Sequence, residues 1–176
     1  MQKLINSLAI GVVAIFVVSA GFALGQELLK DATLQTLTVN DVSIDQAMLV
    51  AQGAIAECKK NNSVVTVAVV DRNGGVRFVL RGDRASPQDV ENARKKAYTA
   101  RTFRQATSVW MERTAPDQAL YGQRMLEDTI AQKGGMPIIW HGDAIGGVGV
   151  AGSKGGEEND EVCAKAGVDA IADQLL

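Results

Sequence analysis

A glycine-rich segment late in the chain places the strongest limit on the fold. Residues 134–137 lead into a predicted strand at 138–140, residues 141–143 predict a tight turn, and residues 144–151 a returning strand, which together form a hairpin. The returning strand and the position after it carry glycine at 146, 147, 149 and 152. Because glycine weakens an isolated strand, we expect a helix, a ligand or another subunit to approach this surface closely.

The rest of the pattern predicts an α+β fold. A β-branched run at 64–70, a turn at 71–75 and a return at 76–80 predict an antiparallel hairpin. Helices are expected from a cap at Ser43 to about Lys60, from Ser86-Pro87 to about Phe103, and from about Asn159 to Leu175. Residues 107–133 are the least regular, with a short helix starting at Pro116. The order helix, hairpin, helix, hairpin, helix predicts an antiparallel sheet with helices packed over it.

Composition limits the class of protein. The 176 residues suit one domain, and the 47% hydrophobic but only 5% aromatic content predicts a core of small aliphatic side chains. The 20 acidic and 18 basic residues are spread along the chain, which argues against a nucleic-acid partner.

The N-terminus has the pattern of an export signal. Lys3 precedes an apolar stretch at 8–18 and small residues at 19–23. We expect a signal peptide over 1–25, a flexible lead-in over 26–37, and a domain over 38–176 that is periplasmic or secreted. The alternative is an uncleaved membrane anchor, since the uncharged stretch approaches the length of a spanning helix.

The two cysteines leave two interpretations open. In an oxidising compartment Cys58 and Cys163 can pair, but both also fit as small buried side chains on the apolar faces of predicted helices. Neither belongs to a CxxC pair, and a chain with one histidine cannot build a Cys/His zinc cage.

Few residues in the sequence carry obvious chemistry. The glycine-rich stretches lack the spacing of a phosphate loop or a dinucleotide fingerprint, although Ser153 and Lys154 can bind an anion. His141 is the only imidazole for a metal or a heme iron, yet its place in a turn also explains it. A lone histidine also argues against a hydrolase of the Ser–His–acid or Cys–His type.

Two further features have a functional and a structural interpretation. Arg81 can hold a carboxylate, either from a ligand or from a side chain such as Asp160. The segment 96–100 offers a helix face for a flat ligand, or its alanines allow a helix to pack closely on the sheet.

Five segments follow one another in a distinctive order: Arg81-Gly82-Asp83, Lys96-Ala97-Tyr98-Thr99-Ala100, Gly134-Gly135-Met136-Pro137-Ile138, residues 142–152 and Asp160-Glu161-Val162-Cys163-Ala164. Together they resemble the GlcG/HbpS heme-binding family, to which the C-terminal domain of the corrinoid adenosyltransferase PduO is related. The resemblance covers about residues 38–175. It implies a profilin-like sandwich, assembly from dimers to octamers, and a heme ligand.

The resemblance also suggests how a heme would be held. Cations at Arg81, Lys96, Arg101 and Lys154 would pair with the propionates, with Tyr98, Thr99 and Met136 also in the binding site. The axial donors, in order of expectation, are His141, Tyr98 and Met136.

The expected function is an exported heme-binding protein for storage, sequestration or sensing, without turnover and with a membrane sensor or transporter as a partner. One alternative is a small-molecule or corrinoid-related enzyme in which Arg81 holds a carboxylate and Lys96 or Tyr98 transfers a proton. Another is an oligomeric structural module.

Overall fold

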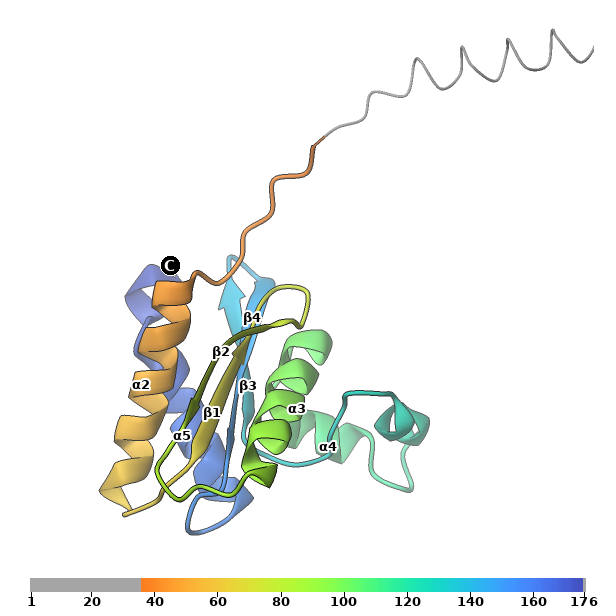
Figure 1. Ribbon diagram of the computed structural model, residues 1–176. Helices are drawn as coiled ribbons and strands as arrows, with labels where there is room; N and C mark the ends of the chain where they lie inside the picture. Colours follow the sequence, from red (N-terminus) through yellow and green to blue (C-terminus); the bar gives the residue numbers. More distant parts are fainter. Residues whose placement is uncertain (1–35, 176) are drawn as a thin grey trace, which may run out of the picture. The chain divides into compact units, whose positions relative to one another are not determined.

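One antiparallel sheet organises the protein. The computed structural model describes residues 36–175, so the predicted signal peptide and most of the lead-in lie outside the described residues. Four strands pair in the order β2-β1-β4-β3, with every neighbour antiparallel (Figure 1). The strands are β1 (Thr66–Val70), β2 (Val76–Arg81), β3 (Gly135–Trp140) and β4 (Asp143–Ala151). Both predicted hairpins are confirmed.

Helices cover both faces of the sheet. The helices are α2 (Ile44–Lys60), α3 (Gln88–Phe103), α4 (Thr107–Arg113) and α5 (Glu157–Asp169), with 3₁₀ turns η1 (Tyr121–Met125) and η2 (Ala172–Gln174). Figure 1 shows α2 and α5 on one face and α3 on the other. The main core, between the sheet and the α2/α5 layer, joins Val67 and Val69 of β1 to residues of α2 and α5. The predicted α+β class is confirmed.

The glycines of β4 admit the helix α3. A Cβ placed on Gly147 would lie 2.5 Å from the carbonyl oxygen of Ala97, and one on Gly149 would collide with the carbonyl oxygen of Ala93. Of the three expected approaches to this surface, the helix is therefore the one observed. The small side chains of α3 serve close packing on the sheet.

The first helix has the predicted ends but a different buried face. Ser43 and Gln46 form a reciprocal capping box, and the helix ends at Lys60. The helical spacing of the apolar residues predicts that Ile44 and Met48 share the buried face with Ala47 and Ala51, but these two side chains are 47% and 38% exposed. The close crossing of α2 and α5 explains the difference, because a Cβ on Gly167 would lie 2.7 Å from the carbonyl oxygen of Val50. Only small side chains fit along that line, so the larger ones lie outside it.

The segment between α3 and β3 differs from its prediction. No helix starts at Pro116 within the described chain: α4 precedes it and η1 follows it. Trp110 anchors α4, because it is 1% exposed and stacks on Phe103 with ring centroids 4.9 Å apart. One buried aromatic side chain thus orders a segment whose sequence shows little periodicity.

The final helix is also shifted. It begins at Glu157, two residues before the predicted start, and ends at Asp169, where η2 follows after a short break. Gly156, with φ of +73°, turns the chain into the helix, and three acidic residues in the first turn suit the exposed amides there.

Candidate functional site

Two grooves lie at the two edges of the sheet. The Met136 groove, of about 300 Å³, lies beside edge strand β3 and is lined by Ser108, Lys133, Met136, Glu158, Glu161, Val162 and Lys165. The Arg81 groove, of about 400 Å³, lies beside edge strand β2 and is lined by Ile55, Lys59, Ser63, Val64, Val65, Leu80, Arg81, Gly82 and Asp83. Both volumes fall at the lower end of the range for ligand pockets.

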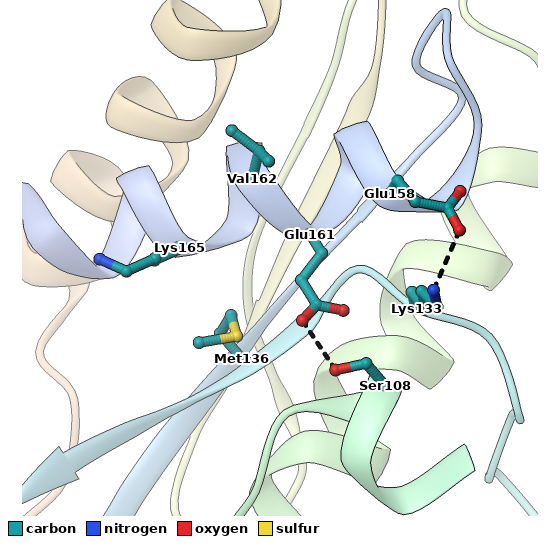
Figure 2. A pocket seen from close by; sticks show the side chains of 7 residues that line it. All are labelled: Ser108, Lys133, Met136, Glu158, Glu161, Val162 and Lys165. Carbon is teal, nitrogen blue, oxygen red and sulfur yellow. Dashed lines mark hydrogen bonds and ion pairs between the residues drawn. The ribbon is translucent and has the colours of Figure 1, made fainter. Parts of the chain in front are cut away.

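The Met136 groove combines a sulfur atom, an apolar wall and a polar rim (Figure 2). Met136 comes from β3, and Val162, 54% exposed, comes from α5. Ser108 of α4 donates a hydrogen bond of 2.7 Å to Oε1 of Glu161. The other oxygen of Glu161 is buried and has no hydrogen-bond partner among the described residues. The groove thus holds a thioether ligand for a soft metal ion and an unused acceptor.

The lysines of this groove are already paired. Nζ of Lys133 lies 3.0 Å from the carboxylate of Glu158, and Lys165 lies 2.6 Å from Asp169 on the same helix. The bond between Lys133 and Glu158 lowers the pKa of the Glu158 carboxyl and raises the pKa of the Lys133 ammonium. Two lysines and two glutamates line the groove, so its formal charge is zero.

The Arg81 groove has more apolar wall and unpaired charges. Its guanidinium donates through Nε and Nη2 to the carbonyl oxygen of Ala85, at 2.9 and 2.6 Å. Among residues 36–175, Lys59, Arg81 and Asp83 enter no ion pair, so the lining carries a formal charge of +1. The alternative in which Arg81 pairs with Asp160 is wrong, because Asp160 has another partner.

That partner is Lys96, in a buried ion pair. Nζ of Lys96 lies 2.8 Å from Oδ2 of Asp160 and 3.0 Å from the carbonyl oxygen of Val150. The backbone amide of Ser153 donates to Oδ1 of Asp160 at 3.0 Å. The two charged side chains are 2% and 5% exposed. The pair ties α3 to α5 at one end of the sheet, and the ammonium of Lys96 lines neither groove.

The remaining predicted site residues do not converge. The ring of Tyr98 lies against Gly74, the buried hydroxyl of Thr99 accepts from the amide of Ile130, and Arg101 lies beside Gly147. Lys154 is exposed, with its amide bonded to Ser63. Of the predicted site residues within residues 36–175, two line these two grooves, one in each groove. These are Met136 and Arg81.

His141 occupies the turn between β3 and β4. It is exposed, has φ of +46°, and contacts the ring of Trp140 edge-on with centroids 4.2 Å apart. Within residues 36–175 no three His, Cys, Asp or Glu side chains gather into a metal-binding cluster. The turn interpretation is thus confirmed, and a metal role for His141 stays a prediction.

Sequence reasoning missed most of the groove residues. Four residues of α5 that line the Met136 groove, Glu158, Glu161, Val162 and Lys165, follow the i, i+3, i+4, i+7 spacing of one helix face. That spacing was visible in the sequence. No comparable signal marks Lys59 and Val64, because they come together with Arg81 only through tertiary packing.

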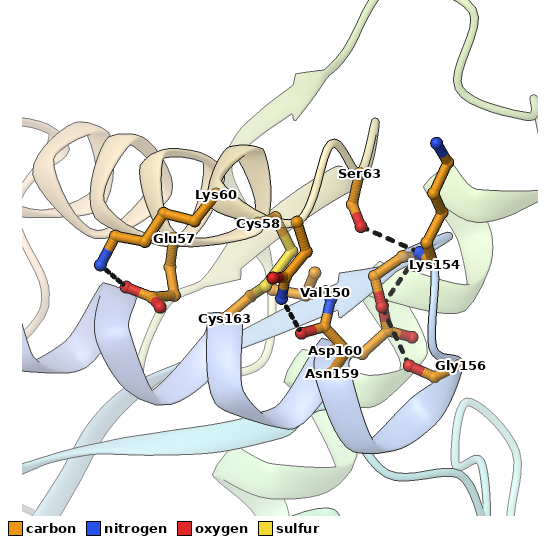
Figure 3. The surroundings of a disulfide bond; sticks show 12 residues. Glu57, Cys58, Lys60, Ser63, Val150, Lys154, Gly156, Asn159, Asp160 and Cys163 are labelled. Atoms are coloured by element: carbon orange, nitrogen blue, oxygen red, sulfur yellow. Dashed lines mark hydrogen bonds and ion pairs between the residues drawn. A yellow bond between two sulfur atoms is a disulfide. The ribbon is translucent and has the colours of Figure 1, made fainter.

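A disulfide joins the helices that form the walls of the two grooves. Cys58 of α2 and Cys163 of α5 are bonded, which decides between the two interpretations of the cysteines (Figure 3). Ile55 and Lys59 flank Cys58 in the Arg81 groove, and Val162 and Lys165 flank Cys163 in the Met136 groove. A single covalent bond therefore holds one wall of each groove.

Comparisons with known proteins place the chain in a family. The family described as "Haem degrading protein HbpS-like" matches residues 42–169. The crystal structure of HbpS is 33% identical with a TM-score of 0.73, over 78% of this chain and 94% of that chain. The crystal structure of a PduOC:heme complex is 27% identical with a TM-score of 0.69, over 74% and 95%.

A longer relative shares only part of its length. The corrinoid adenosyltransferase PduO of Salmonella typhimurium is 31% identical over 144 residues, which span 81% of this chain but 41% of that protein. The resemblance in the ordered motifs is thus confirmed over the folded domain. With the family match covering most of its length, the chain belongs to the HbpS-like family.

Proposed function

We propose that this protein is an exported heme-binding protein and that the Met136 groove holds the iron side of the heme. One observation carries the choice of groove. Of the three candidate axial donors, His141, Tyr98 and Met136, the methionine alone lines either groove. Membership in the HbpS-like family and the likeness to a PduOC:heme complex support heme as the ligand.

The lining suits part of a heme. The thioether of Met136 is an established type of heme ligand, and Val162 offers an apolar wall to the ring. Lys133 and Lys165 can bond to propionates. Bound heme would supply an iron centre with redox and ligand-binding chemistry. The groove of about 300 Å³ is smaller than a porphyrin, so a second copy of the chain would cover the rest, which supports a homo-oligomer.

The acidic residues of the groove oppose an anionic ligand. Propionates would have to displace Glu158 from Lys133 and Asp169 from Lys165. Glu161 adds a carboxylate whose second oxygen has no partner in the described part of the chain. Replacing Glu161 with Gln should therefore tighten hemin binding about tenfold, because it removes one repulsive charge.

The disulfide supports export. Disulfides persist in the periplasm and outside the cell and are rare in the cytosol of most organisms. No helix within residues 36–175 has the length and hydropathy to span a bilayer. Fractionation of cells that express the full-length chain should place the oxidised protein in the periplasm or medium. Recovery of a reduced protein from the cytosol alone would contradict export.

The test of the heme site is a titration of hemin into purified residues 26–176. We expect a saturable Soret shift that weakens about tenfold or more in Met136→Leu, which keeps the volume and removes the sulfur ligand. His141→Ala is the matched control, since its ring lies outside the groove. A shift lost in His141→Ala and kept in Met136→Leu would move the iron to the turn and overturn the proposal.

A second measurement separates binding from turnover. The family description names heme degradation, whereas we propose storage, sequestration or sensing without turnover. The heme-loaded protein, incubated with ascorbate in air, should keep its Soret band at the rate of a non-enzymatic hemin–albumin control. Faster loss of the band with release of carbon monoxide would identify a degrading enzyme.

A further inference from the structure

We infer that the Arg81 groove is a second ligand site, specific for a small aliphatic monocarboxylate. This inference stands beside the heme proposal and does not depend on it. The groove lies at the opposite edge of the sheet from the Met136 groove, on β2, α2 and the segment before β1. Its volume of about 400 Å³ is large enough for a ligand of that size.

The walls of the groove select an aliphatic body. Ile55 of α2, Val64 and Val65 before β1, and Leu80 of β2 all line it. Val65 is buried and Val64 is 47% exposed, so the wall runs from the core to the surface. Gly82 packs closely against this wall, because a Cβ there would lie 3.0 Å from both Val64 and the carbonyl oxygen of Val65. Burial of an alkyl chain against these side chains is favourable.

The charges select a single negative head group. Lys59 and Arg81 face the groove with one carboxylate, Asp83, and none of the three enters an ion pair among the described residues. The net charge of +1 matches a monoanion. A carboxylate also fits the planar guanidinium, which can donate two parallel hydrogen bonds.

Arg81 is held in place before any ligand arrives. Two of its N–H groups donate to the carbonyl oxygen of Ala85, a neutral acceptor in a buried residue. The bond fixes the side chain without neutralising its charge. A ligand therefore meets an oriented cation and loses little side-chain entropy on binding.

The same lining disfavours heme. It contains no His, Met, Cys or Tyr, so it offers no strong side-chain ligand to a heme iron. The one hydroxyl group of this lining, that of Ser63, already accepts a hydrogen bond from the backbone amide of Lys154. The Arg81 groove and the Met136 groove thus differ in the ligand chemistry that each can recognise.

The experiment titrates sodium octanoate into heme-free, oxidised residues 26–176 and follows backbone amide shifts by NMR. We expect saturable shifts around residues 63–65 and 80–83, and none for octanol or octylamine at the same concentration. Arg81→Gln should weaken binding about tenfold or more, because charge-assisted hydrogen bonds are lost. Lys59→Gln changes an exposed side chain that makes no hydrogen bond or ion pair among the described residues, and it should weaken binding severalfold even if Arg81→Gln folds poorly.

A pair of valines provides the matched control. Val64→Asp places a negative charge in the wall and should abolish binding. Val76 of β2 is similarly exposed, at 53%, but lies outside the groove, so Val76→Asp should leave binding unchanged. Equal binding by Val64→Asp and wild type, or by octanol and octanoate, would overturn the inference. Hemin titrations run separately would test the heme proposal, since octanoate binding requires no iron ligand.

Discussion

The two grooves are built alike but are charged differently. Each places one helix of the α2/α5 layer beside one edge strand, and the disulfide between Cys58 and Cys163 holds both helices. The Met136 groove contains two lysines that are already paired, and the Arg81 groove contains charges without ion-pair partners in the described structure. Similar architecture therefore gives one groove suited to a metal-centred ligand and one suited to a free carboxylate.

The difference shows that residue types alone do not define a binding site. Both grooves have cations and aliphatic side chains, and a list of residues would treat them as equal. What separates them is whether a cation already has an acid beside it, since a paired cation must first be released before it can bind an anion. The sulfur of Met136 then decides which groove can reach a metal.

The largest effect should come from the bond that both grooves share. Cys58→Ala combined with Cys163→Ala opens a loop with a sequence separation of 105 residues. We expect the free energy of unfolding to fall by about 4 kcal/mol, measured by urea denaturation. Both hemin and octanoate binding should weaken together. Loss of one alone would show that the two grooves do not share this support.

The buried ion pair should give the next largest effect. Asp160→Asn leaves the ammonium of Lys96 buried without its counter-charge and should lower the free energy of unfolding by about 3 kcal/mol. Asp160 lies in α5 between residues that line the Met136 groove. Hemin binding should therefore suffer more than octanoate binding. Titration of the same sample with hemin and with octanoate measures both losses of affinity. Equal losses would mean that the ion pair supports the whole domain rather than one edge of the sheet.

A negative charge added at one valine of each groove tests the two grooves separately. Val162→Asp should weaken hemin binding about tenfold and leave octanoate binding unchanged, because it adds a negative charge beside Met136. Val64→Asp should abolish octanoate binding and leave hemin binding unchanged. Val162 and Val64 are 54% and 47% exposed, so thermal denaturation should show little change in either. If either valine substitution weakened the binding of both ligands, the two grooves would have to be treated as one binding site.

The sequence predicted the sheet better than the site. Residues 64–70 and 144–151 combine β-branched or glycine-rich runs with flanking turns, and that local signal is enough for the hairpins. Segment 107–133 escaped prediction because residues distant in sequence hold it: Ser108 donates to Glu161, and Arg94 pairs with Asp128. Local patterns cannot report such contacts.

The functional residues were harder for the same reason. The sequence places Lys96 on a helix rich in basic residues, which is typical of a solvent-exposed face. In the structure Lys96 is buried, because it forms an ion pair with Asp160, 64 residues later in the chain. Met136 and Arg81 were found because their residue types carry chemistry. Their placement in separate grooves required the fold.

Acid should weaken the ion pair between Lys133 and Glu158 in the Met136 groove, with the smallest effect of all. Lys133 lowers the pKa of Glu158 below its ordinary 4.5, so the pair stabilises the folded state above that pH and the contribution disappears as the pH falls through the lowered pKa. Glu158→Gln should therefore be slightly less stable than wild type at pH 7 and equal to it in strong acid. Asp83→Asn in the Arg81 groove, with no ion pair to lose among residues 36–175, is the matched control and should be as stable as wild type at pH 7. Because Glu158 is exposed, added salt should also reduce the difference in free energy of unfolding between Glu158→Gln and wild type. Urea denaturation at several pH values, in low and high salt, measures this difference. A difference that survives acid and salt would show that Glu158 acts through packing instead of charge, and the contrast between a paired and an unpaired groove would then fail.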